Sequence, residues 1–119
     1  TFPHSDDVLP ADVETSNLPE VSERLDIPVT RVHDLLREGT LLAVRRNGVV
    51  VVAEVFFDGE EVVRFLPGLV SVLRDGGYQD PEILRWLFEV DDSLPGRPAD
   101  ALHGHRAREV IRRAQAMAF

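Results

Sequence analysis

Apolar and polar residues recur at helical spacing in two short segments that follow each other closely. In the first segment the apolar positions fall at i, i+3 and i+7, at Leu18, Val21 and Leu25. Asn17 followed by Glu20 is an approximate capping box, so a helix is predicted to begin there. Pro28 cannot lie inside a helix, so this helix is predicted to end near Leu25.

A second helix is predicted over residues 29–37, with Gly39 as its C-terminal stop. Its apolar face carries Val29, Val32, Leu35 and Leu36. Its polar face centres on Thr30, Asp34 and Arg37, with Arg31 and His33 at the edges. Two helices separated by about three residues have the layout of a helix-turn-helix, whose second helix enters the major groove of DNA.

A β-hairpin is predicted directly after the second helix. Two strand-like segments, Leu-Leu-Ala-Val-Arg-Arg at 41–46 and Val-Val-Val-Val-Ala at 49–53, flank Asn47-Gly48, the pair preferred in a type I′ two-residue turn. Arg45 and Arg46 lie at the tip, so the hairpin forms a basic wing. Strand alternation points these two side chains to opposite faces.

The second half of the chain is predicted to be helical. Residues 66–74 show helical spacing and end at Gly76-Gly77, Asp80 caps a following helix, and a last helix runs from about His105 to residue 119. A helical turn is expected at 54–57, a strand or helix lead-in at 61–65, and a turn-rich connector at 91–98.

The predicted fold class is therefore mainly α with a small antiparallel β-hairpin (α+β). Residues 17–65 form a winged helix-turn-helix domain and residues 66–119 a helical C-terminal domain. Residues 1–16 are acidic, contain two prolines and show no periodicity, so a disordered acidic tail is predicted.

Composition narrows the class of protein. The 119 residues contain no cysteine, which excludes disulfides and thiolate metal sites. No apolar run reaches about 18 residues and no signal-peptide pattern is present, so the protein is predicted to be cytoplasmic, with no membrane contact. His103 and His105 are interpreted as surface or capping residues. No metal, cofactor or enzymatic activity is predicted.

The net charge of −8 argues against general nucleic-acid binding, but positive charge is concentrated in two segments. Residues 29–48 carry a net +2 and residues 97–119 a net +3, and all 13 basic residues are arginines. Binding to DNA needs only a local basic face, and each guanidinium suits phosphate or guanine.

The predicted DNA-binding residues lie on the second helix and the wing: Thr30, Arg31, His33, Asp34, Arg37, Arg45 and Arg46. Asp34 repels phosphate unless it accepts from a cytosine amino group, and it can instead pair with Arg31 or Arg37. Arg108 and Arg112 are candidates for a second DNA contact. The alternative is a solvated helix surface with a Glu109–Arg113 pair.

The acidic N-terminal segment suggests regulation. Residues 1–28 carry a net −6, so this segment is a candidate to fold back on the basic wing and compete with DNA. A Ser/Thr kinase acting on Thr1, Ser5, Thr15 or Ser16 would add about 1.5–2 negative charges and strengthen that competition.

Several strings resemble a known family. Leu25-Asp-Ile-Pro-Val-Thr-Arg-Val, residues 36–41 and residues 43–46 resemble the excisionase/MerR-type winged helix-turn-helix. Together with the segments 66–69, 75–78, 85–88, 97–103 and 107–116, they more closely resemble a family of small actinobacterial DNA-binding regulators. This resemblance implies a winged-helix DNA binder with a helical C-terminal region. The second half also faintly resembles the toxin-binding domain of certain antitoxins.

The predicted function is that of a transcriptional regulator that binds double-stranded DNA. Its recognition helix enters the major groove, and its arginine-bearing wing meets the backbone or the minor groove. The alternative is a protein-interaction module, antitoxin-like or an adaptor, that acts through its C-terminal half. The chain lacks a long heptad pattern, so no coiled-coil dimer is predicted. We expect a monomer or a compact homodimer.

Overall fold

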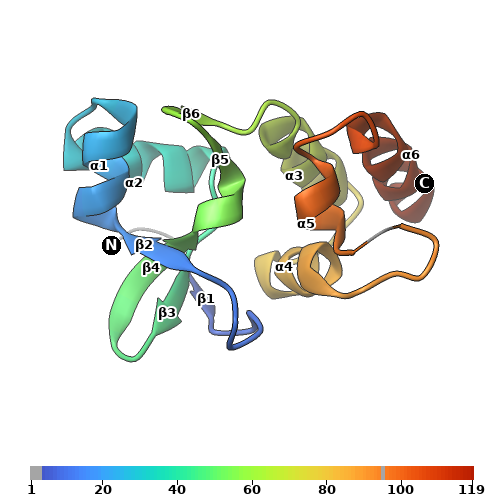
Figure 1. Ribbon diagram of the computed structural model, residues 1–119, viewed down its shortest axis with the longest axis horizontal. Coiled ribbons are helices and arrows are strands. Elements are labelled where there is room, and N and C mark those ends of the chain that lie inside the picture. Colours follow the sequence, from blue (N-terminus) through green and yellow to red (C-terminus); the bar gives the residue numbers. More distant parts are fainter. Residues whose placement is uncertain (1–3, 95) are drawn as a thin grey trace.

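The computed structural model describes residues 4–94 and 96–119 and confirms the α+β fold class. The helix-turn-helix and a small sheet lie at one end of the long axis, and the C-terminal helices lie at the other (Figure 1). The two helices of the motif are α1 (Leu18–Leu25) and α2 (Val29–Glu38).

Local interactions explain where α1 begins and ends. The Asn17 side-chain oxygen accepts from the backbone N–H of Glu20 at 2.9 Å, and the Glu20 carboxylate accepts from the backbone N–H of Asn17 at 2.9 Å. This reciprocal pair confirms the predicted capping box. The helix ends where Asp26 adopts a left-handed conformation with φ 55°. The Ser22 hydroxyl then donates to the carbonyl of Ile27, which fixes the turn before α2.

Helix α2 ends at Gly39, as predicted. Gly39 has φ 79°, a left-handed conformation that glycine adopts without a steric penalty. Val32 and Leu36 are buried on the inner face of the helix, and Thr30 lies exposed on its outer face.

The wing consists of β3 (Val44–Arg46) and β4 (Val49–Ala53), which pair antiparallel with Arg46 opposite Val49. Asn47 and Gly48 both have positive φ, 52° and 79°, as a type I′ turn requires. The predicted hairpin and its turn type are therefore confirmed.

The predicted disorder of residues 1–16 is wrong for the described residues 4–16. Two further strands, β1 (Ser5–Asp6) and β2 (Thr15–Asn17), extend the hairpin into a four-stranded sheet of order β1-β3-β4-β2. β1 runs parallel to β3, and β2 runs antiparallel to β4. The two edges of the hairpin offer unpaired backbone groups that these strands satisfy, and Leu9 between them is buried in the core.

The rest of the chain continues from the wing through η1 (Glu54–Phe56) and a small hairpin of β5 (Phe57–Asp58) and β6 (Glu61–Val62). Four helices follow: α3 (Leu66–Asp75), α4 (Asp80–Phe88), α5 (Pro98–Ala101) and α6 (Ala107–Ala118).

Three details of the helical half differ from the prediction. Gln79, rather than Asp80, caps α4, in a capping box with Glu82. The last helix begins at Ala107 rather than at about His105. The four-residue helix α5 was not predicted, because one turn is too short to show helical periodicity.

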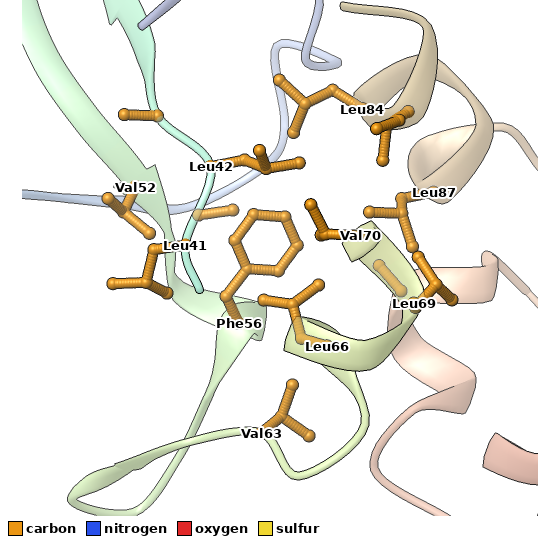
Figure 2. Close-up of a cluster of buried hydrophobic side chains, with 14 of the residues drawn as sticks. Leu41, Leu42, Val52, Phe56, Val63, Leu66, Leu69, Val70, Leu84 and Leu87 are labelled. Carbon is orange, nitrogen blue, oxygen red and sulfur yellow. The ribbon is translucent and has the colours of Figure 1, made fainter. Parts of the chain in front are cut away.

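One core joins the two halves. The ring of Phe56 lies among side chains from the wing region and from α3 and α4, including Leu41, Val52, Leu66 and Leu84 (Figure 2). Phe56 also packs against Phe88, with ring centroids 5.7 Å apart. The buried cluster therefore continues across residue 65, so the recognition helix and the helical half are built on a shared apolar support. The domain boundary at 65/66 stays a prediction.

Candidate nucleic-acid interface

The outer face of α2 carries two arginines that are paired within the helix. Nη1 of Arg31 lies 3.0 Å from Oε1 of Glu38, and Nη1 of Arg37 lies 2.8 Å from Oδ1 of Asp34. Asp34 also lies 4.0 Å from Arg31. Of the two alternatives for Asp34, a contact with cytosine or a pair with an arginine of the helix, this structure shows the pair: the carboxylate is a partner for both neighbouring guanidinium groups.

These pairs hold the two cations weakly. All four side chains are about half exposed, between 47% and 52%. Exposed ion pairs contribute about 0–1 kcal/mol to stability, because water and salt screen the charges. A phosphate group can therefore replace a carboxylate as the partner of Arg31 or Arg37 at little cost.

The other predicted contacts on α2 differ in exposure. Thr30 is exposed in the first turn of the helix, where its hydroxyl and methyl groups are accessible. His33 is half-buried, on the flank of the helix. Thr30, Arg31 and Arg37 therefore form the accessible part of the helix.

Arg46 is occupied by the N-terminal segment. Its Nε and Nη2 donate to the two carboxylate oxygens of Asp7 at 2.8 and 3.1 Å. Nη1 donates to the carbonyl of Val13, and Nη2 donates to the carbonyls of Leu9 and Pro10. These contacts leave the side chain 17% exposed.

The hydrogen bond from Arg46 lowers the pKa of the Asp7 carboxyl, and the same contact raises the pKa of the Arg46 guanidinium. The pair is thus ionised on both sides at neutral pH. The guanidinium is directed at the N-terminal segment rather than at solvent, so Arg46 fixes that segment to the wing next to its turn. The Arg46 guanidinium is therefore occupied within the chain and is not open to an external anion.

Arg45 lies on the other side of the same strand. It is exposed, opposite Val50 on β4, and makes no hydrogen bond or ion pair with any residue that the structure describes. Of the two wing arginines, Arg45 is therefore the one available to an external anion.

The predicted second contact lies far from the first. Helix α6, which carries Arg108 and Arg112, lies at the opposite end of the molecule from α1 and α2 (Figure 1). Arg112 donates to Glu109 through Nε and Nη2 at 2.9 and 2.6 Å, and Arg113 donates to Glu109 at 2.9 Å, which confirms the predicted Glu109–Arg113 pair. Arg108 is exposed, with no ion pair among the described residues.

The candidate phosphorylation sites are mostly covered. Ser5 and Ser16 are buried within the sheet, where Ser5 donates to the carbonyl of Asp6 and Ser16 donates to Glu54. Thr15 is half-buried on β2, and Thr1 lies outside the described residues. A kinase would reach Ser5 or Ser16 only if β1 or β2 left the sheet.

Sequence reasoning missed the long-range ion pairs. Asp7 pairs with Arg46 across 39 residues, and Asp12 pairs with Arg97 across 85 residues, with Nη2 to Oδ1 at 3.1 Å. The hydrogen bond from Arg97 lowers the pKa of Asp12. Arg74 also pairs with Asp80 at 2.9 Å. None of these pairs lies at helical or strand spacing, so no local pattern reveals them.

Within residues 4–94 and 96–119, no three or more His, Cys, Asp or Glu side chains are grouped to hold a metal ion. In the same part of the chain, no helix has both the length and the apolar character needed to cross a membrane.

Both halves of the chain are similar to known proteins. Residues 1–57 match a family model described as "DNA-binding protein Rv2175c, wHTH domain", and residues 63–118 match one described as "Rv2175c C-terminal domain of unknown function". The DNA-binding protein Rv2175c of Mycobacterium tuberculosis (strain ATCC 25618 / H37Rv) is 52% identical over an alignment 132 positions long, which covers 100% of this chain and 90% of the relative. The NMR structure of Rv2175c superimposes with a TM-score of 0.90 at 53% identity, over 99% of this chain and 90% of that one. The chain therefore belongs to the Rv2175c family of winged helix-turn-helix proteins.

Proposed function

We propose that this protein binds double-stranded DNA and acts as a transcriptional regulator. In this arrangement α2 enters the major groove, and the wing places Arg45 on the phosphate backbone or in the minor groove. The observation that carries the proposal is that Arg45 is exposed and unpaired among the described residues, at the end of the molecule that also presents α2. The family's winged helix-turn-helix description supports it.

Contacts with phosphate and contacts with bases have different roles in this proposal. Arg31 and Arg37 exchange their carboxylate partners for phosphates, which positions the helix without reading sequence. Thr30, at the start of α2, approaches base edges or a thymine methyl group. The flanking His33 is a weaker candidate because it is half-buried.

The overall negative charge favours one orientation on DNA. The chain carries −8, and the β5–β6 hairpin exposes Asp58, Glu60 and Glu61. Phosphate repels this acidic hairpin, which lies beside α1 (Figure 1), so we expect α2 and Arg45 to meet DNA in an orientation that keeps the hairpin away from the backbone. We therefore give the remote residues Arg108 and Arg112 a contact only with a separate segment of DNA.

The test is fluorescence-anisotropy binding to a random-sequence duplex across a series of salt concentrations. Each phosphate contact contributes about −0.9 to the slope of log affinity against log salt. We expect Arg45→Ala to weaken binding and reduce that slope by about one contact. Arg85→Ala is the matched control, because Arg85 is also exposed and unpaired among the described residues but lies on α4. Absence of binding by the wild-type protein at low salt would overturn the proposal.

A protein partner bound through the helical half is the second candidate. The observation that favours it is the exposure of apolar side chains there: Val90 at 65%, Met117 at 36% and Phe119 at 92%. Binding through exposed apolar side chains, including self-association as a compact homodimer, would depend weakly on salt, in contrast to DNA binding. Sedimentation equilibrium of the wild-type and Phe119→Ser proteins tests self-association.

We also propose that a Ser/Thr kinase controls DNA binding by this protein. Thr15 is the least covered of the candidate hydroxyls that the structure describes, and it lies on β2, beside the wing strand β4. A phosphate there would add negative charge next to the wing and oppose DNA binding. Mass spectrometry of kinase-treated protein, with Thr15→Ala and Thr1→Ala variants, identifies the modified residue.

A further inference from the structure

The C-terminal end of the recognition helix touches the helical half at one glycine. Gly39 is buried, and a Cβ atom built on it would lie 3.0 Å from Cζ of Arg74 and still closer to Nη1 of that residue. A side chain at position 39 would force the guanidinium group of Arg74 to move, and the φ of 79° would strain it as well. Gly39 therefore serves two purposes, the left-handed turn and the close approach of a guanidinium group.

Arg74 is held in this place by a residue of another helix. It lies in the last turn of α3, and its Nε and Nη2 donate to the two carboxylate oxygens of Asp80 at 3.0 and 2.9 Å. Asp80 lies in the first turn of α4. The bidentate contact fixes the plane of the guanidinium group and leaves Nη1 directed at Gly39.

The position suits a cation electrostatically. The last carbonyls of a helix carry partial negative charge, and a positive group near them is favourable. Backbone hydrogen bonds hold the turn at Gly39: the amides of Gly39 and Thr40 donate to the carbonyls of Leu36 and Leu35 at 3.3 and 3.0 Å. A guanidinium locked against this turn restricts the motion of the end of α2.

We propose that Arg74 is a positioning residue for DNA binding. Clamped by Asp80, it holds the C-terminal end of α2 against the helical half and so sets the angle at which the recognition helix is presented. This inference rests on the proposed DNA-binding function. It gives the C-terminal half a role in recognition that needs no contact between that half and DNA.

A positioning residue differs from a phosphate contact in a measurable way. Arg74 acts through Gly39, so its removal lowers affinity without removing a phosphate contact, and the salt slope stays unchanged. It also differs from a residue that only supports the core. Its side chain is 31% exposed, so truncation leaves no buried cavity.

The experiment compares Arg74→Ala, Arg74→Lys and Asp80→Asn with the control Arg85→Ala. Two quantities are measured: affinity for a random duplex across a salt series, and amide hydrogen exchange at Gly39 and Thr40, with amides of α1 as the internal reference. Asp80→Asn keeps the Arg74 side chain and releases only its clamp, so it tests the proposal even if Arg74→Ala folds poorly.

We expect Arg74→Ala to weaken DNA binding by about 2- to 30-fold at an unchanged salt slope. Exchange at Gly39 and Thr40 is expected to accelerate relative to α1. Lysine cannot donate in a bidentate manner, so Arg74→Lys restores little, and Asp80→Asn shifts both measurements in the same direction. Arg85→Ala changes neither.

Unchanged exchange at Gly39 and Thr40 in both Arg74→Ala and Asp80→Asn would overturn the inference. A salt slope reduced by one contact in Arg74→Ala would also overturn it, because Arg74 would then be a direct phosphate contact. If the wild-type protein binds no DNA, the proposed function fails, and with it the role in recognition. The exchange measurement still decides whether Arg74 restrains α2.

Discussion

Arg46 of the wing and Asp7 of the N-terminal segment form a two-point ion pair, with Nε to Oδ2 at 2.8 Å and Nη2 to Oδ1 at 3.1 Å. The same guanidinium group also donates to the carbonyls of Leu9, Pro10 and Val13. One side chain thus holds the loop between β1 and β2 against the wing, next to the turn at Asn47-Gly48.

Removing Arg46 is therefore expected to destabilise the protein. Arg46→Ala leaves an acidic side chain and three carbonyls without their donor, so the free energy of unfolding falls by about 1–3 kcal/mol. Arg45→Ala, one residue away and exposed, changes it by less than about 0.5 kcal/mol. Urea unfolding measures both, and a double-mutant cycle with Asp7→Ala isolates the pair. Equal losses at positions 45 and 46 would contradict this assignment.

Neutralising Asp34 is expected to strengthen DNA binding. Asp34→Asn frees Arg37 from its partner at 2.8 Å and removes a negative charge from the face that meets DNA. The expected gain is about two- to fivefold, the equivalent of an exposed pair worth about 0.5–1 kcal/mol. Anisotropy titration at one fixed salt concentration measures it. Asp92→Asn, an exposed acid in the helical half, is the control that makes the same change in net charge.

The shared core predicts that the two halves unfold together. Phe56→Ala removes a fully buried ring at the junction and is expected to cost about 3–5 kcal/mol. Trp86 is the single tryptophan and lies on α4, so its fluorescence follows the helical half, while far-UV circular dichroism follows the whole chain. Coincident transitions are expected for the wild type and for Phe56→Ala. Separate transitions would show that the halves fold independently.

Helix α6 is expected to lose support in acid. Hydrogen bonds from Arg112 and then Arg113 lower the pKa of Glu109 from 4.5 to about 2. A carboxyl whose pKa is lower in the folded state stabilises the protein above its unfolded pKa and loses that contribution as pH falls through the folded pKa. The contribution of Glu109 is thus complete above about pH 5 and declines between 4.5 and about 2.

Glu109→Gln provides the measurement of this effect. The difference in unfolding free energy between the wild type and this variant is expected to be constant from pH 7 to about 5 and to shrink below 4.5. Glu89→Gln is the control, because Glu89 is exposed and its side chain makes no hydrogen bond or ion pair with any residue that the structure describes. A difference between wild type and Glu109→Gln that does not change down to pH 2.5 would contradict the prediction.

Much of the fold was predictable because it depends on neighbours in sequence. The capping box of Asn17 and Glu20, the stop at Gly39 and the turn at Asn47-Gly48 each involve groups at most four residues apart. Their conformations follow from hydrogen bonding and steric limits within one turn of chain. Such local rules are enough to specify the two helices of the motif and the wing.

The sequence by itself therefore determined the winged helix-turn-helix, and it left open whether Asp34 contacts a base or pairs with Arg31 or Arg37. The tertiary structure alone decided that residues 4–16 join the sheet and that, of two adjacent arginines, Arg45 faces solvent while Arg46 is occupied. The physical reason is distance along the chain. Edge strands and ion pairs across 39 or 85 residues form only after the chain has folded back on itself, and composition does not show which groups will meet.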